Sequence, residues 1–174
     1  LLVEVPEYEK PEQPKLPKGF RFVPFGESAM QIPEMLVGRI LECGNLAELY
    51  GDSNTGKSFV ALDLAFSVAT GCLWHGEAVQ QGGVLYLAGE GREGLIRRRQ
   101  AWEIARGQSL EEAPVYLSSE ATDLTDEERR QEVLSRIREK AEQVSLKLVV
   151  IDTLSRHFGG KDENQTSEMS QFVS

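Results

Sequence analysis

Two short runs of apolar residues are the clearest pattern in the chain. Residues 84–88 read VLYLA and residues 146–151 read LKLVVI, and the two runs together contain a single charged residue, Lys147. Runs of this length with almost no polar alternation are typical of strands covered on both faces. We therefore expect two buried strands of one sheet.

Helical patterns and shorter strand candidates alternate with these two runs. In chain order they are a short strand at 45–50, helices at 57–69 and 95–106, a short strand at 115–117 and a charged helix at about 126–144. Alternation of strands and helices predicts an α/β fold with a mainly parallel sheet flanked by helices. Such sheets bind their ligands at the carboxyl ends of the strands.

The first 33 residues lack this pattern. Proline and glutamate recur through residues 1–18, a composition that keeps the backbone extended and offers little apolar surface to bury. Residues 20–40 carry short apolar groups interrupted by Pro24 and Pro33, which suggests a strap packed against a core. We expect an arm and strap at 1–33 and one α/β domain at 34–174. Because the chain starts at Leu1 and ends soon after a strand, we expect that domain to be truncated at its C-terminus.

Composition narrows the class of protein. Of 174 residues 40% are hydrophobic, and no apolar run approaches the ~20 residues of a membrane span. Cys43 and Cys72 form no CxxC pair, so we expect reduced thiols and a cytoplasmic location.

The formal net charge of −9 opposes binding of nucleic acid by the surface as a whole. Any DNA contact must therefore be local or come from residues outside this sequence.

One motif carries specific chemistry. Residues 51–58 read GDSNTGKS and match GxxxxGK[ST], the P-loop pattern, where a predicted strand leads into a helix. A chance match in a chain this long is on the order of one in a hundred. In such loops, backbone N–H groups and the helix N-terminus bind phosphate, the lysine reaches the outer phosphates and the serine hydroxyl binds Mg²⁺. The alternative is a glycine-rich turn at the start of a helix that binds no nucleotide.

The motif predicts ATP and Mg²⁺ as ligands. We assign Lys57 a catalytic role as well as a binding role, and Ser58 to the metal. The predicted nucleotide-binding residues are Gly51, Asp52, Ser53, Asn54, Thr55, Gly56, Lys57, Ser58 and Phe59.

Two carboxylates follow the apolar runs. Asp152 ends the second run, as a Walker B aspartate does, and is the expected second magnesium residue. Thr153 comes next, so the water-activating glutamate found beside this aspartate in many ATPases must come from elsewhere. Glu90 follows the first run and would share the same sheet edge, so we assign it as the general base. The alternatives are a helix N-cap for Asp152 and a solvated loop carboxylate for Glu90.

These features together resemble the RecA-like P-loop ATPase core, over about residues 34–174. Three segments are similar to RepA-type hexameric replicative helicases and related AAA-family ATPases of plasmids and phages: LYGDSNTGKSFVALDLAFSVATG, GGVLYLAGEG and LVVIDTLSRHFGGKDEN. The resemblance implies that Glu90 activates the attacking water. It also implies a homo-oligomeric, hexameric ring with ATP between subunits and an arginine finger from the neighbour. The DNA-facing loops would lie beyond residue 174, and single-stranded DNA would be the partner of the complete protein.

The leading hypothesis is therefore the ATPase motor domain of a RepA-like DNA helicase. A regulatory or loader ATPase without unwinding activity, and a nucleotide-binding assembly module without turnover, stay open as alternatives. For Arg97, Arg98 and Arg99 we favour a solvated helical face over a role at the nucleotide. His157 lies where a RecA-like protein would sense the γ-phosphate, but a lone histidine is more often an ordinary surface or core residue.

Overall fold

The structure, a computed structural model, describes residues 22, 24, 26, 32–89 and 91–159. The chain divides into two compact units, Leu1–Ile32 and Pro33–Ser174. All helices and strands named below belong to the second unit.

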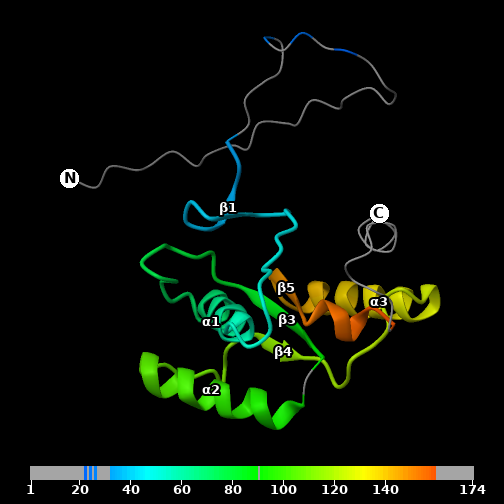
Figure 1. The fold of residues 1–174 in the computed structure, drawn as a ribbon. Coiled ribbons are helices and arrows are strands. Elements are labelled where there is room, and N and C mark those ends of the chain that lie inside the picture. Colours follow the sequence, from blue (N-terminus) through cyan, green and yellow to red (C-terminus); the bar gives the residue numbers. More distant parts are fainter. Residues whose placement is uncertain (1–21, 23, 25, 27–31, 90, 160–174) are drawn as a thin grey trace. The chain divides into compact units, whose positions relative to one another are not determined.

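A three-stranded parallel sheet forms the centre of this unit (Figure 1). Strand β3 (Gly83–Ala88) lies between β4 (Val115–Leu117) and β5 (Leu146–Asp152) and runs parallel to both. Ala88 pairs with Asp152, so β3 and β5 end at the same edge of the sheet. The predicted α/β fold with a parallel sheet is confirmed, as are the strands expected from the two apolar runs.

Three helices follow the predicted order. They are α1 (Lys57–Thr70), α2 (Arg92–Arg106) and α3 (Glu127–Gln143). Helix α1 ends at Gly71, whose φ of 78° lies in the left-handed region that glycine adopts without strain. Helix α3 begins after Asp126, whose carboxylate accepts a hydrogen bond from the backbone N–H of Arg129 at 3.0 Å. Local end signals therefore fix the helices close to where the sequence predicts them.

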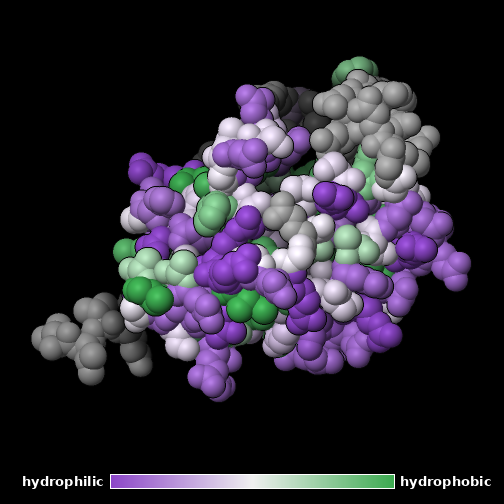
Figure 2. Space-filling view, turned by 60° about the horizontal axis from the view of Figure 1, so that its bottom comes forward, coloured by the Kyte–Doolittle hydropathy of each residue, from purple (hydrophilic) through white to green (hydrophobic). Residues whose placement is uncertain are grey.

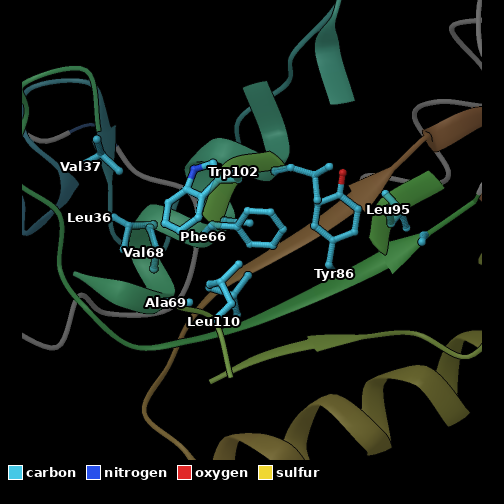
Figure 3. Close-up of a cluster of buried hydrophobic side chains, with 13 residues drawn as sticks. Leu36, Val37, Phe66, Val68, Ala69, Tyr86, Leu95, Trp102 and Leu110 are labelled. Atoms are coloured by element: carbon cyan, nitrogen blue, oxygen red, sulfur yellow. The ribbon is translucent and has the colours of Figure 1, made fainter. Parts of the chain in front are cut away.

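Alternate residues of β3 face two separate cores. Val84, Tyr86 and Ala88 pack with α1 and α2, whereas Leu85 and Leu87 pack with α3. Figure 1 shows α1 and α2 on one side of the sheet and α3 on the other. The α1 side holds the larger core, which Figure 3 shows in close-up.

Aromatic rings fill the larger core. The Phe66 and Trp102 rings meet edge to face, with centroids 5.4 Å apart, and join α1 to α2. In Figure 3 the ring of Tyr86 rises from β3 beside Phe66, with its hydroxyl at the tip. This packing fixes the distance between the P-loop helix and the sheet.

The α3 side of the sheet is less completely covered. Val149 and Ile151 are 38% and 36% exposed, although they pair with the buried Leu85 and Leu87 of β3. The prediction that both apolar runs are covered on both faces therefore holds for β3 and is wrong for β5. The physical reason is that α3 has no fully buried residue among those described, so it shields only part of this face.

The strand predicted at 45–50 is absent from the described structure. All six residues are exposed, Leu46 and Tyr50 at 81% and 85%. A strand needs a neighbour for its backbone N–H and C=O groups, and within the described residues no strand pairs with this segment. The segment thus leads into the P-loop as extended chain outside the sheet.

A small hairpin precedes this segment. Strands β1 (Met35–Val37) and β2 (Leu41–Glu42) pair antiparallel. Leu36 and Val37 are buried in the larger core, and the Gln80 N–H donates to the Leu36 carbonyl at 2.9 Å. This part of the apolar segment 20–40 therefore packs against the larger core.

The face in Figure 2 is mainly hydrophilic, and its apolar residues lie in separate groups. Within the described residues, no helix has both the length and the apolar character needed to cross a membrane. Cys43 and Cys72 are not joined to each other in a disulfide.

A carboxylate at the α1–α2 contact generates the first prediction. Asp63 accepts hydrogen bonds from Trp102 Nε1 at 2.7 Å and from Arg106 Nη2 at 2.8 Å. Asp63→Ala would leave the indole N–H of a nearly buried tryptophan without its acceptor, so we expect the free energy of unfolding to fall by about 1–3 kcal/mol. Urea denaturation measures this change. As a control, Glu139→Ala removes an exposed ion pair with Arg136 and should cost less than about 0.5 kcal/mol. Equal costs for the two variants would contradict the assigned role of Asp63.

Candidate nucleotide site

The loop at 51–56 bends sharply between the extended segment and α1. Asn54 and Gly56 have φ values of 64° and 90°, in the left-handed region that asparagine tolerates and glycine favours. Thr55 Oγ1 donates a hydrogen bond to the Asp52 carbonyl at 2.8 Å, which closes the bend. The residues expected to contact phosphate thus form one compact loop at the start of α1.

Lys57 spans this loop. Its Nζ atom donates hydrogen bonds to the carbonyl oxygens of Gly51 at 2.6 Å and Asp52 at 2.8 Å. Within the described residues, no side chain caps the first turn of α1. The loop therefore combines a fixed ammonium group with helix N–H groups that no side chain occupies, an arrangement that fits an anionic phosphate.

The structure brings Ser58 and Asp152 together across 94 positions of the sequence. Ser58 Oγ donates a hydrogen bond to Asp152 Oδ1 at 3.1 Å. Asp152 is nearly buried and belongs, like Tyr86 and Ala88, to the α1 side of the sheet. A hydroxyl and a carboxylate oxygen are hard ligands, and Mg²⁺ commonly takes one or two protein ligands and completes its shell with water and phosphate. The pair fits such an ion.

Tyr86 holds the other oxygen of the same carboxylate. Its phenol donates to Asp152 Oδ2 at 2.5 Å in a buried position. Sequence reasoning missed this residue, because a tyrosine inside an apolar strand was counted as core alone. The signal was present, since a buried tyrosine hydroxyl usually finds a polar partner. Asp152 is thus oriented by one hydrogen bond at each oxygen.

Glu90, the predicted general base, lies outside the described residues. Its neighbours are described: Gly89 follows the last residue of β3, and Gly91 precedes the first residue of α2. The Gly89 N–H donates to the Asp152 backbone carbonyl at 2.6 Å. Gly89 therefore lies beside the backbone of Asp152 at this edge of the sheet.

The three consecutive arginines of α2 have different surroundings, and one of them contacts Phe59. The guanidinium carbon of Arg98 lies 4.9 Å from the centroid of the Phe59 ring, a cation–π contact between α2 and α1. Arg97 is exposed, and Arg99 forms an ion pair with Glu103 one turn away at 3.1 Å. The solvated face favoured for the whole run describes Arg97 and Arg99, whereas Arg98 packs against a residue of the P-loop helix.

His157 is a core residue. It ends the 3₁₀ helix η2 (Leu154–His157), is fully buried, and has no hydrogen-bond partner for either ring nitrogen within the described residues. Burial lowers the pKa of His157, and the nearby negative charge of Asp152 opposes this shift. The side chain is therefore held mainly neutral beneath the site.

A parallel sheet, a P-loop that opens a helix, and a carboxylate at a strand end define the P-loop nucleotide-binding class. Comparison with protein families agrees: residues 11–174 match the AAA domain family, and the chain belongs to that family. It is thus an ATPase-type nucleotide-binding domain. The match also covers most of residues 1–33. No curated protein and no solved structure matched the chain.

The buried histidine generates a prediction about acid stability. The pKa of His157 is lowered in the folded state, so protonation favours unfolding, and stability is lost as the pH falls below the unfolded value of about 6.5. We expect His157→Leu to lose less stability than the unsubstituted protein between about pH 7.5 and pH 5. Urea midpoints in magnesium-free buffer measure the difference. Identical pH dependence in His157→Leu would refute the prediction.

Proposed function

We propose that this chain is the ATP-hydrolysing motor domain of a RepA-like DNA helicase, with magnesium-dependent attack of water on the γ-phosphate. The single observation that carries the ATPase part is the hydrogen bond between Ser58 Oγ and Asp152 Oδ1. It joins the residue that follows the P-loop lysine to the carboxylate at the end of β5. The P-loop motif and the strand-end aspartate, which are identified from separate parts of the sequence, are thus in contact beside the loop.

Each group has a distinct task in this proposal. The backbone N–H groups of residues 51–59 and the Lys57 ammonium bind the phosphate chain. Mg²⁺, when bound, neutralises charge on the phosphates, and Ser58 and Asp152 are the residues that would hold it. Glu90 accepts the proton of the attacking water. Catalysis of this kind depends on positioning and electrostatics, because no covalent intermediate with the protein is required.

The helicase part of the proposal rests on the resemblance of three segments to RepA-type enzymes. It implies a homo-oligomeric ring that acts on single-stranded DNA. A regulatory or loader ATPase is the main alternative, because the family and the site are equally compatible with assembly that separates no strands. A net charge of −9 adds no argument for DNA binding by this part of the protein.

The decisive test is ATP turnover of the longest expressible protein, with and without single-stranded DNA. Removing a general base commonly costs 10²–10⁴-fold in rate, so we expect Glu90→Gln to lose at least about 100-fold in turnover while still binding nucleotide. Lys57→Ala should lose binding as well as turnover, because it removes the phosphate-binding cation.

A matched control and three contrary outcomes complete this test. Glu132→Gln changes an exposed glutamate of α3 and should leave turnover intact. Turnover that DNA does not stimulate would favour the regulatory ATPase. Turnover that survives Glu90→Gln would overturn the assigned base, and binding without any turnover would favour the assembly module.

The tyrosine beside the metal residues gives a further prediction. Groups that orient metal ligands typically contribute 10–100-fold to metal affinity or activity. Because Tyr86 donates to Asp152 Oδ2, we expect Tyr86→Phe to raise the Mg²⁺ concentration needed for half-maximal nucleotide binding by about 10-fold. Tyr116→Phe, on the partly exposed face of β4, is the control. An unchanged magnesium dependence in Tyr86→Phe would show that the hydrogen bond does not orient Asp152 for the ion.

A further inference from the structure

Ser118 holds the end of β3 from the β4 side. Its Oγ atom accepts a hydrogen bond from the Ala88 N–H at 2.9 Å, and its own N–H donates to the Tyr86 carbonyl at 2.9 Å. At the start of the same two strands, the Val84 N–H donates to the Pro114 carbonyl at 2.8 Å. The Ser118 hydroxyl thus continues the hydrogen-bond ladder between β3 and β4 one step beyond the last residue of β4.

This hydroxyl does the work of a backbone carbonyl. Ala88 is buried, so its N–H has little access to water, and a buried N–H that lacks an acceptor is costly. Ser118 is half-buried, whereas the next residue, Ser119, is exposed. The Ser118 side chain is therefore the group that satisfies the last N–H of β3, and an alanine in its place would remove this acceptor.

The end of β3 is held from the β5 side as well. Ala88 pairs with Asp152, and the N–H of the next residue, Gly89, donates to the Asp152 carbonyl at 2.6 Å. The carboxylate of this aspartate is a candidate magnesium ligand and accepts a hydrogen bond from the phenol of Tyr86, which also belongs to β3. A continuous set of hydrogen bonds therefore runs from Ser118 across β3 to Asp152.

We propose that Ser118 is a positioning residue for the magnesium site: its hydroxyl holds the end of β3 against β5 and so keeps the Asp152 carboxylate oriented for Mg²⁺. This inference rests on the proposed function, in which Ser58 and Asp152 hold the ion. Loss of the hydroxyl would let the end of β3 shift, and with it the Tyr86 phenol that donates to Asp152 Oδ2. Groups that orient metal ligands in this way contribute to metal affinity without touching the metal.

The magnesium dependence of nucleotide binding tests this inference, with a non-hydrolysable ATP analogue titrated at a series of Mg²⁺ concentrations. A single hydrogen bond within a protein changes an equilibrium by roughly 2–10-fold. We expect Ser118→Ala to raise the Mg²⁺ concentration for half-maximal binding by about 3–5-fold, less than Tyr86→Phe, because Ser118 acts through the strand. Affinity for the analogue in Mg²⁺-free buffer should stay within about 2-fold. Ser118→Thr keeps the hydroxyl and should restore the original Mg²⁺ dependence.

A second measurement follows the hydrogen bond itself in protein without nucleotide or metal. Hydrogen exchange of the Ala88 amide, measured by NMR, should be at least about 2-fold faster in Ser118→Ala, because the amide loses its acceptor. Ser119→Ala removes an exposed hydroxyl one residue away and should change neither the exchange rate nor the Mg²⁺ dependence. Should Ser118→Ala fail to fold, Ser118→Cys keeps the shape with only a weak sulfur acceptor, and the same results are expected of it.

Failure of the inference and failure of the proposed function give different results. An unchanged Mg²⁺ dependence in Ser118→Ala, or an unchanged exchange rate of the Ala88 amide, overturns the role of Ser118 while the proposed function stands. Equal losses of affinity with and without Mg²⁺ likewise overturn it, because they show a general disturbance of the protein. If the unsubstituted protein binds no nucleotide, or binds it equally at every Mg²⁺ concentration, the proposed function fails and the inference fails with it.

Discussion

The hydrogen bond between Ser58 and Asp152 is the contact on which the rest of the site depends. It joins the first turn of α1 to the last residue of β5, so that the P-loop is held at the carboxyl edge of the sheet. The contact is possible because Asp152 belongs to the α1 side, in register with Ala88 of β3. A shift of one residue in β5 would turn this carboxylate toward α3 and separate the two motifs.

Much of this fold could be predicted from the sequence, because long patterns with clear end signals determine it. Helix α1 has glycine at both ends, and β3 is apolar throughout. The strand expected at 45–50 failed for a reason that no local pattern contains. Its apolar residues suit a strand, but a strand exists only with a hydrogen-bonding neighbour, and that depends on residues far away in the sequence.

The residues of the candidate site likewise include some that the sequence predicts and some that it does not. Ser58 and Asp152 are found from the sequence because each belongs to a motif with fixed spacing and known chemistry. Tyr86 is not, since its importance comes from the carboxylate that lies next to it after folding. Tyr86 reaches Asp152 across neighbouring strands. A sequence pattern identifies a residue type but not the partner that folding brings beside it.

The acidic net charge bears differently on the two halves of the proposed function. Charges on the surface are screened over about 8–10 Å at physiological salt, so a bound phosphate responds chiefly to the groups that touch it. Lys57 supplies such a group within the loop, and a total of −9 does not oppose it. A nucleic-acid strand is different, because its many phosphates sample a wide surface and its affinity depends on clustered cations. Nucleotide binding is therefore decided by local geometry, whereas DNA binding needs a basic surface that this part of the chain does not supply by its overall charge.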